Sequence, residues 1–315
     1  MPDIVPGRAR GAPHAPSGPG LGTVSGVSTP PFLSLPEGVH AARIVTPRGD
    51  FAALEAGPAG PTVLLVPGWT GSKEDFVALL APLAAHRYHV VALDQRGQFE
   101  SPGSALESDY ALSALADDLL AMARAVATTP VHLVGHSFGG LVARAAAIAD
   151  PDAVASLTLL CSGPGPQPVD RHDLLRAMAD AIPAIGLPAT WEAKRAYERS
   201  LAAPEPPPEI ELFMRRRFLA NHPEALRAMT LHLTTAEDEV DALKATGVPV
   251  MVSFGAADDG WPVGEQREMA ARLGAPAMAI QGAGHSPAAE QPARTVAALV
   301  EFWAGVELDR GRIGA

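Results

Sequence analysis

Ser137 stands in a pattern that could make its hydroxyl a nucleophile. Residues 135–139 read Gly-His-Ser-Phe-Gly, after the apolar run 131–134 and before a helix-favouring segment rich in small residues. A serine at the tip of a sharp strand-to-helix turn needs small residues two positions before and after it, because strand and helix approach closely there. The pattern predicts nucleophilic chemistry at Ser137, and a neighbouring base must assist it because an unassisted hydroxyl is a poor nucleophile.

Because the chain contains 30 glycines, the pattern by itself is weak evidence for a nucleophile, and the elements around it must support it. Apolar and β-branched runs predict eight strands, at residues 42–46, 51–55, 62–66, 89–93, 131–134, 156–160, 248–254 and 277–281. Apolar residues at helical spacing predict helices at 73–86, 112–127, 138–149, 263–273 and 290–304. The first two strands flank a turn and would form an antiparallel edge.

This alternation predicts the α/β fold class, with a mostly parallel, twisted, eight-stranded sheet and helices on both faces. Ligands in such sheets bind beyond the carboxyl ends of the strands. Residues 37–162 and 246–315 form this predicted core. Residues 163–245 interrupt the alternation with a Pro-rich, helix-favouring stretch, which we interpret as an inserted helical lid. This stretch contains three consecutive arginines at residues 215–217. We interpret them as part of a solvated helix face rather than as a site for an acidic substrate.

Composition excludes several classes of partner. A net charge of -11 argues against binding to nucleic acid or to an anionic membrane surface. The single cysteine, Cys161, cannot form an intrachain disulfide and is expected to be a buried apolar side chain. Residues 1–36 are rich in Pro and Gly and lack the apolar core of a signal peptide, so we expect a flexible extension, a cytoplasmic location and no membrane insertion. The oligomeric state stays open.

Five loops at the predicted strand ends resemble the functional loops of the α/β-hydrolase fold superfamily. They are residues 67–69 (Pro-Gly-Trp), 94–97 (Asp-Gln-Arg-Gly), 135–139, 255–262 and 282–292. The resemblance extends over residues 41–162 and 246–304. It implies the α/β-hydrolase fold, in the branch with a serine nucleophile and a helical lid, and a catalytic triad in the chain order Ser, Asp, His.

By this resemblance, Ser137 is the nucleophile and His285 is its base. His285 lies on a glycine-rich loop after the last strand, where the backbone can turn the imidazole toward the serine. The family spacing between a glycine and a proline, here Gly255 and Pro262, places the triad carboxylate at Asp258. Asp259 is the alternative, and its structural role would be to cap the following helix.

An oxyanion that forms at Ser137 needs preorganised hydrogen-bond donors. The backbone N–H of Phe138, at the start of the predicted helix, is one. The resemblance implies that the backbone N–H of Trp69 is the second. The chain has Pro67-Gly68 where the family usually has His-Gly, and residues 98–101 depart from the usual Gly-x-Ser continuation, so both loops could have their own shape. The Trp69 indole has two interpretations, as a wall of the acyl pocket and as a core side chain.

Three other polar side chains have structural interpretations. His136, next to the nucleophile, is interpreted as a packing or loop-orienting residue. Asp94 and Arg96 resemble a structural turn of the family, and an ion pair between them would hold that loop.

A serine in this position favours acyl chemistry on a small-molecule substrate, which would be an ester, a lactone or a thioester. Alternatives are C–C bond hydrolysis or lyase chemistry, or acyl transfer, with the same triad. A non-catalytic ligand-binding member of the fold is a further alternative. No His, Cys or Asp cluster shows ligand spacing along the sequence, so neither a metal nor a cofactor is expected.

Overall fold

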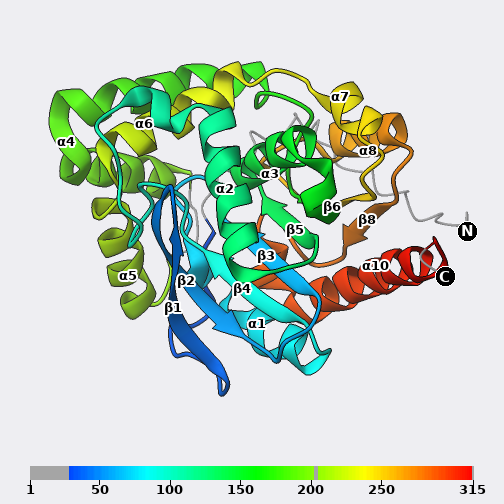
Figure 1. Cartoon of the computed structure of the whole chain (residues 1–315). Coiled ribbons are helices and arrows are strands. Elements are labelled where there is room, and N and C mark those ends of the chain that lie inside the picture. The colour runs from blue at the N-terminus through cyan, green and yellow to red at the C-terminus, as the bar shows by residue number, and fades with distance from the viewer. Residues whose placement is uncertain (1–27, 202–204, 314–315) are drawn as a thin grey trace, which may run out of the picture.

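The protein is built around one sheet. A computed structural model describes residues 28–201 and 205–313, and eight strands of these residues form the sheet in the order β1-β2-β4-β3-β5-β6-β7-β8 (Figure 1). The strands are β1 (Val39–Thr46), β2 (Gly49–Ala56), β3 (Thr62–Val66), β4 (His89–Leu93), β5 (Val131–His136), β6 (Val154–Leu160), β7 (Val250–Gly255) and β8 (Ala277–Ile280). The predicted α/β class and eight-stranded sheet are confirmed.

Strand direction determines where the loops gather. β1 pairs antiparallel with β2, and β2 antiparallel with β4, whereas every other pair is parallel. In the parallel part, Val66 of β3 is in register with Gly135 of β5, and His136 is in register with Leu160 of β6. The carboxyl ends of these neighbouring strands therefore meet at one edge of the sheet, and so do the loops that follow them.

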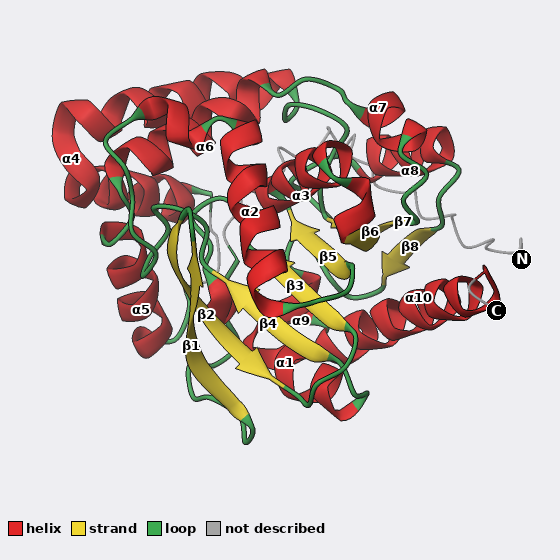
Figure 2. Cartoon of the chain, viewed as in Figure 1, coloured by secondary structure: helices red, strands yellow, loops and turns green. Residues whose placement is uncertain are grey.

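Helices cover both faces of the sheet (Figure 2). Beside the insertion described below, they are the 3-10 helix η1 (Lys73–Phe76), α1 (Val77–Ala85), η2 (Glu107–Tyr110), α2 (Leu112–Val126), α3 (Phe138–Ala149), η3 (Pro151–Ala153), α7 (Val240–Ala245), α8 (Val263–Leu273), α9 (Pro287–Glu290) and α10 (Pro292–Ile313). Leu64 and Val66 of β3 pack in one apolar cluster with α2 and α3, while Val63 and Leu65 pack in another with α1 and α10. A strand buried on both faces needs such a continuous apolar run.

Two predicted helices are each divided. The segment predicted at 73–86 begins as the 3-10 helix η1 before α1. The last predicted helix, 290–304, is α9 followed by α10, with Gln291 between them in a non-helical conformation. Pro292 explains this second break, because a proline ring disfavours helical geometry in the residue before it and suits the first turn of a new helix.

A helical insertion separates β6 from α7. It contains the 3-10 helix η4 (Val169–Arg171), α4 (His172–Ser200), α5 (Pro208–Leu219) and α6 (Pro223–Thr235). Figure 1 shows α4, α5 and α6 grouped together beside one end of the sheet. Gly186 divides α4 into two halves with a φ of 76°, a left-handed conformation that favours glycine. Trp191 and Phe213 of the insertion belong to an apolar cluster that also contains Phe99 of the core.

Of the predicted N-terminal extension, residues 1–27 lie outside the described residues. The next residues contact the insertion: the carbonyl of Ser28 accepts a hydrogen bond from Arg217 of α5 at 2.8 Å, and the Thr29 hydroxyl lies 3.9 Å from the sulfur of Met214. Within the described part of the chain, no helix has both the length and the apolar character needed to cross a membrane.

Candidate active site

Ser137 occupies the turn between β5 and α3 in a strained conformation. Its φ of 53° and ψ of −120° are unusual for a residue with a side chain. A Cβ atom on Gly139 would lie 2.4 Å from the carbonyl oxygen of Val66, and one on Gly135 would lie 2.4 Å from the carbonyl oxygen of Gly139. No side chain fits at either position, which is the steric reason for the glycines that the sequence predicted.

Three of the predicted side chains form a continuous hydrogen-bonded chain at the carboxyl edge of the sheet. The hydroxyl oxygen of Ser137 lies 3.0 Å from Nε2 of His285, and Nδ1 of His285 lies 2.6 Å from Oδ1 of Asp258. The three residues follow β5, β8 and β7 respectively, and all three are buried. A hydroxyl, an imidazole and a carboxylate in this order can move a proton away from the hydroxyl.

The carboxylate bonded to His285 belongs to Asp258 and not to Asp259, which the sequence had left as an alternative. Burial by itself raises the pKa of Asp258, but hydrogen bonds from three donors bring it below its usual value. The donors are His285, the side-chain amide of Gln266 at 2.6 Å and the backbone N–H of Gly260 at 2.8 Å. Asp258 is therefore a carboxylate that can orient His285 and stabilise its protonated form.

Close packing also fixes the His285 imidazole. A Cβ atom on Gly260 would lie 2.1 Å from the imidazole ring, so only glycine leaves room for it. On another side, Nε2 of His136 donates to the carbonyl oxygen of His285 at 2.7 Å. Burial lowers the pKa of His136 to about 4, which keeps this ring neutral near pH 7. His136 thus lies where its predicted loop-orienting role requires.

The two predicted oxyanion donors lie on neighbouring segments. Phe138 is the first residue of α3, where backbone N–H groups have no partner within the helix. Trp69 follows β3, and a Cβ on the adjacent Gly68 would come within 3.0 Å of Cβ of Ser137. The loop that carries Trp69 therefore runs directly against the nucleophile.

Two glutamines that sequence reasoning missed hold this loop. Gln98 donates from its amide to the carbonyl of Gly68, and Gln95 to the carbonyl of Pro67, each at 2.9 Å. The backbone N–H of Gln95 also donates to the side-chain oxygen of Gln98 at 3.2 Å. These bonds secure a loop that lacks the usual imidazole. The departure at residues 98–101 marked the segment that contains Gln98 as unusual, but it indicated neither Gln95 nor the bonds themselves.

The predicted ion pair between Asp94 and Arg96 is wrong. Asp94 accepts hydrogen bonds from both the backbone N–H and the ammonium of Lys73, each at 2.8 Å. Arg96 instead reaches Asp118 on α2 at 2.6 Å. Lys73 of η1 supplies the cation for Asp94, and Arg96, two residues further along, pairs elsewhere.

The three arginines of α5 do not share one solvated face, as the sequence had suggested. Arg215 is partly exposed and pairs with Glu192, whereas Arg217 is buried and pairs with Asp75 on the core at 2.6 Å. The carboxylate one turn before Arg215, Glu211, pairs with Arg195 of α4 instead. The Arg217–Asp75 pair therefore joins the insertion to the core.

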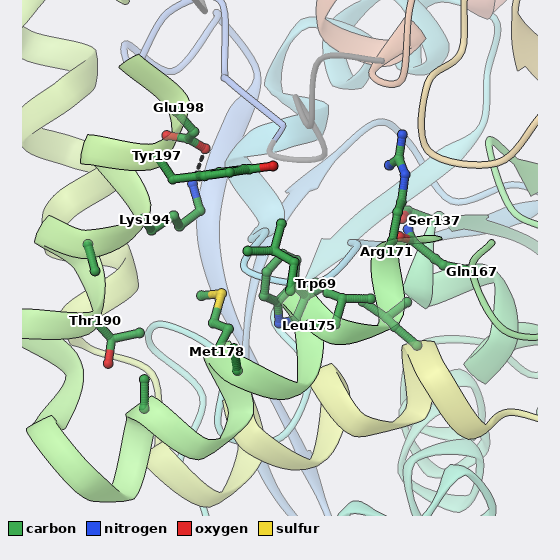
Figure 3. Close-up of a pocket in the computed structure, with 15 residues that line it drawn as sticks. Trp69, Ser137, Gln167, Arg171, Leu175, Met178, Thr190, Lys194, Tyr197 and Glu198 are labelled. Atoms are coloured by element: carbon green, nitrogen blue, oxygen red, sulfur yellow. Dashed lines mark hydrogen bonds and ion pairs between the residues drawn. The ribbon is translucent and has the colours of Figure 1, made fainter. Parts of the chain in front are cut away.

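A cavity of about 230 Å³ opens beside Ser137, between the core and the insertion. Figure 3 shows Leu175 and Met178 of α4 along it, together with Trp69. The indole of Trp69 donates to the hydroxyl of Thr230 on α6 at 2.9 Å. Trp69 thus lines the cavity, as the first of its two interpretations predicted, and also attaches the oxyanion loop to the insertion.

Potential metal ligands also meet at this site. Among the described residues, His136, Cys161 and His285 form one group, and Asp258, Asp259 and His285 form another, with ligand atoms within 4.8 Å of one another in each. Spacing along the sequence could not show these groups, because His136, Cys161, His285 and the adjacent pair 258–259 lie at the ends of four different strands. His285 belongs to both groups, and its ring nitrogens already face Ser137 and Asp258. We assign no metal to it.

Comparison with known proteins supports the fold and the reaction class. Residues 63–299 match the profile of the alpha/beta hydrolase family. RutD of Variovorax paradoxus (strain S110), named as a carbamate hydrolase, is 38% identical over 152 residues, which are 44% of this chain and 57% of that protein. A pimeloyl-[acyl-carrier protein] methyl ester esterase of Methylococcus capsulatus is 32% identical over 176 residues, or 50% of this chain and 65% of the esterase. The chain thus spans less than two thirds of these relatives.

A solved structure extends the similarity over most of the chain. A thermophilic esterase from Thermogutta terrifontis has 26% sequence identity and a TM-score of 0.68. The superposition covers 85% of this chain and 99% of the esterase. The core and the insertion together therefore have a counterpart in a single known protein.

Proposed function

Since this chain belongs to the alpha/beta hydrolase family, we propose that it is a serine hydrolase that cleaves an ester, lactone or thioester bond of a small organic substrate. The observation that carries the proposal is the hydrogen-bonded series from Ser137 through His285 to Asp258, at the end of a cavity lined mostly by apolar side chains. The role of each residue follows from its contacts.

In the first step, the Ser137 oxygen attacks the substrate carbonyl while Nε2 of His285 takes the hydroxyl proton. Asp258 keeps the His285 imidazole in the orientation that this transfer needs. Negative charge develops on the carbonyl oxygen, and the backbone N–H groups of Trp69 and Phe138 stabilise it. Collapse of this intermediate expels the alcohol or thiol, which receives the proton from His285, and leaves an acyl group on Ser137.

In the second step, water attacks the acyl group with His285 as its base, and Ser137 is released. The insertion, which we propose acts as a lid over residues 163–245, separates this chemistry from bulk solvent and determines which substrates fit. Residues 37–162 and 246–315 provide the hydrolase core. The cavity volume of about 230 Å³ favours small substrates, since sites for drug-sized ligands measure roughly 300–1,000 Å³.

Replacement of Ser137 by alanine tests the proposal. We expect Ser137→Ala to lower kcat for short p-nitrophenyl esters by roughly 10⁶-fold and to prevent labelling by a fluorophosphonate. Ser113→Ala, on an exposed position of α2, is the matched control and should retain both properties. Undiminished turnover by Ser137→Ala would overturn the proposal.

A carbamate is the second candidate substrate class, because RutD of Variovorax paradoxus shares 38% identity over 152 residues. The same nucleophile, base and oxyanion donors can attack a carbamate carbonyl. A substrate panel that includes carbamates beside esters of matched size separates the two candidates by their kcat/KM values.

A further inference from the structure

The cavity has two chemically different ends. Ser137 and Arg171 lie on one side and Lys194 and Glu198 on the opposite side, with apolar side chains such as Trp69 and Leu175 between them (Figure 3). Lys194 and Glu198 belong to the half of α4 that follows the break at Gly186. A substrate held at Ser137 that fills the cavity would therefore bring its far end to a charged pair.

The hydrogen bonds of this pair leave donors available on the lysine. The ammonium of Lys194 donates to one carboxylate oxygen of Glu198, and Arg195 donates to the other at 2.6 Å. Both oxygens of Glu198 are thus engaged by cations. A lysine ammonium has three N–H donors, and in the described part of the chain Glu198 is the acceptor bonded to this one. Lys194 can therefore donate to a ligand without losing Glu198.

Burial, rather than the net charge of the cluster, favours a ligand acceptor beside Lys194. The side chains of Lys194 and Glu198 are 8% and 9% exposed. Burial lowers the pKa of Lys194, Glu198 opposes this shift, and the nearby cations Arg195 and Arg217 add to it. Arg195 pairs with Glu205 and Glu211 as well as with Glu198. Glu205 and Glu211 are more exposed, at 57% and 29%, so solvent screens their charges, whereas Glu198 is buried beside both cations. A ligand carboxylate would compensate the buried ammonium.

We propose that the part of the substrate inside the cavity is an apolar chain that ends in a carboxylate, and that Lys194 binds this carboxylate. The proposal rests on the proposed function, because Ser137 must hold the scissile carbonyl at the opposite end. The substrate class is a monoester of a short dicarboxylic acid, if the acyl part enters the cavity, or an ester of an ω-hydroxy acid, if the alcohol part enters.

Paired substrates test this assignment. Monoethyl esters of dicarboxylic acids with five to eight carbons are compared with ethyl esters of the matching monocarboxylic acids. In parallel, ω-acetoxy carboxylates are compared with the matching alkyl acetates. In one of the two series, kcat/KM should be roughly 10- to 100-fold higher for the substrate with the carboxylate, as expected for a hydrogen bond to a charged group. The series that shows this preference identifies whether the acyl part or the alcohol part of the substrate enters the cavity. No preference in either series would overturn the proposal.

Substitution of Lys194 tests whether this residue causes the preference for the carboxylate substrate. In Lys194→Met the ratio of the two kcat/KM values should fall to about one, whereas Lys244→Met, an exposed lysine on α7, should retain the wild-type ratio. Lys194→Met/Glu198→Gln removes both charges of the pair and shows whether the effect of Lys194→Met comes from the loss of its ion pair with Glu198. A ratio unchanged in both Lys194 variants would overturn the assignment.

A binding measurement separates this proposal from the proposed function. Monoethyl glutarate and ethyl pentanoate are titrated calorimetrically into the Ser137→Ala variant, which needs no turnover. Monoethyl glutarate, which has the carboxylate, should bind roughly 10-fold more tightly, and the addition of Lys194→Met should remove the difference. If no ester is hydrolysed but monoethyl glutarate is still preferred, the hydrolase proposal fails and the Lys194 site stands. Equal binding of the two esters would overturn the Lys194 site.

Discussion

The carboxyl edge of the sheet and the helical insertion are held in place by different means. At the sheet edge, neighbouring backbones set the positions, as where β3 and β5 pair in parallel and Gly139 fits against Val66. The insertion is attached mainly through side chains: the Arg217–Asp75 ion pair, the Trp69–Thr230 hydrogen bond, and apolar side chains such as Leu175 and Met229 that pack on the core.

This difference has consequences for sequence and for function. Backbone packing allows few residue types, so the sheet edge has recognisable motifs around Ser137 and His285. Side-chain attachment allows many solutions, because any cation and carboxylate of suitable length can meet across an interface. We therefore expect substitutions at the sheet edge to affect catalysis and substitutions at the insertion contacts to affect stability and substrate choice.

The largest expected effect lies at the sheet edge. Asp258→Asn should lower kcat by roughly 10⁴-fold, because an amide cannot orient or stabilise the imidazole of His285 as the carboxylate does. Asp259→Asn is the matched control and should change kcat only a few-fold. Steady-state kinetics on a short ester measure both. An equal loss in the two variants would contradict the assignment of the triad acid.

The attachment of the insertion has the next effect. Arg217→Met leaves the buried carboxylate of Asp75 without its cation, which should lower the free energy of unfolding by about 3–5 kcal/mol. Arg215→Met removes a partly exposed arginine of the same helix and should cost about 1 kcal/mol or less. Urea denaturation measures both changes. Similar losses would show that Arg217 does not anchor the insertion.

The oxyanion loop, where the two regions meet, should show a smaller effect. Gln98→Leu removes the donor to the Gly68 carbonyl and should lower kcat by roughly 10- to 100-fold through displacement of the Trp69 N–H. KM should change little, because Gln98 does not line the cavity. Gln98→Glu, which retains the length but lacks the amide donor, should behave similarly. A change confined to KM would argue against a positioning role.

The smallest effect concerns the sheet itself. Burial lowers the pKa of His132 in β5 to about 4, and Arg310 acts in the same direction, while its ring contacts Ser156 and Glu307. A histidine with a depressed pKa stabilises the fold above its usual pKa of about 6.5, and this contribution is lost as the pH falls toward 4. In that window the unfolding free energy of the wild type should fall more steeply with acidification than that of His132→Gln.

The difference in slope is at most about 1.4 kcal/mol per pH unit. Urea titrations at several pH values between 4 and 6.5 measure it. Parallel pH profiles for the wild type and the variant would contradict a buried neutral His132.

Much of the fold was predictable because its signals are local. Most of the eight strands contain a short apolar run, and the turn at Ser137 needs glycine at fixed positions. Asp258 and Asp259 were not separable from periodicity or composition, since both follow β7 and differ by one position. The roles of Gln95 and Gln98 could not be foreseen, because each donates to a carbonyl about 30 residues away in the sequence.

The partners of the charged residues were the weakest predictions. Asp94 and Arg96 are close in the chain, yet each pairs with a residue from another element. Charges on long side chains pair with whichever partner folding brings near, and proximity along the sequence has little influence on the outcome.

By itself, the sequence determined the order of strands and helices, the turn at Ser137 and the family of the chain, because these depend on periodicity and on backbone sterics. Only the tertiary structure decided which aspartate bonds to His285, which glutamines hold the Trp69 loop, and that Lys194 lies at the far end of the cavity from Ser137. Those features depend on contacts between segments distant in sequence, whose relative positions are set by packing of the whole chain.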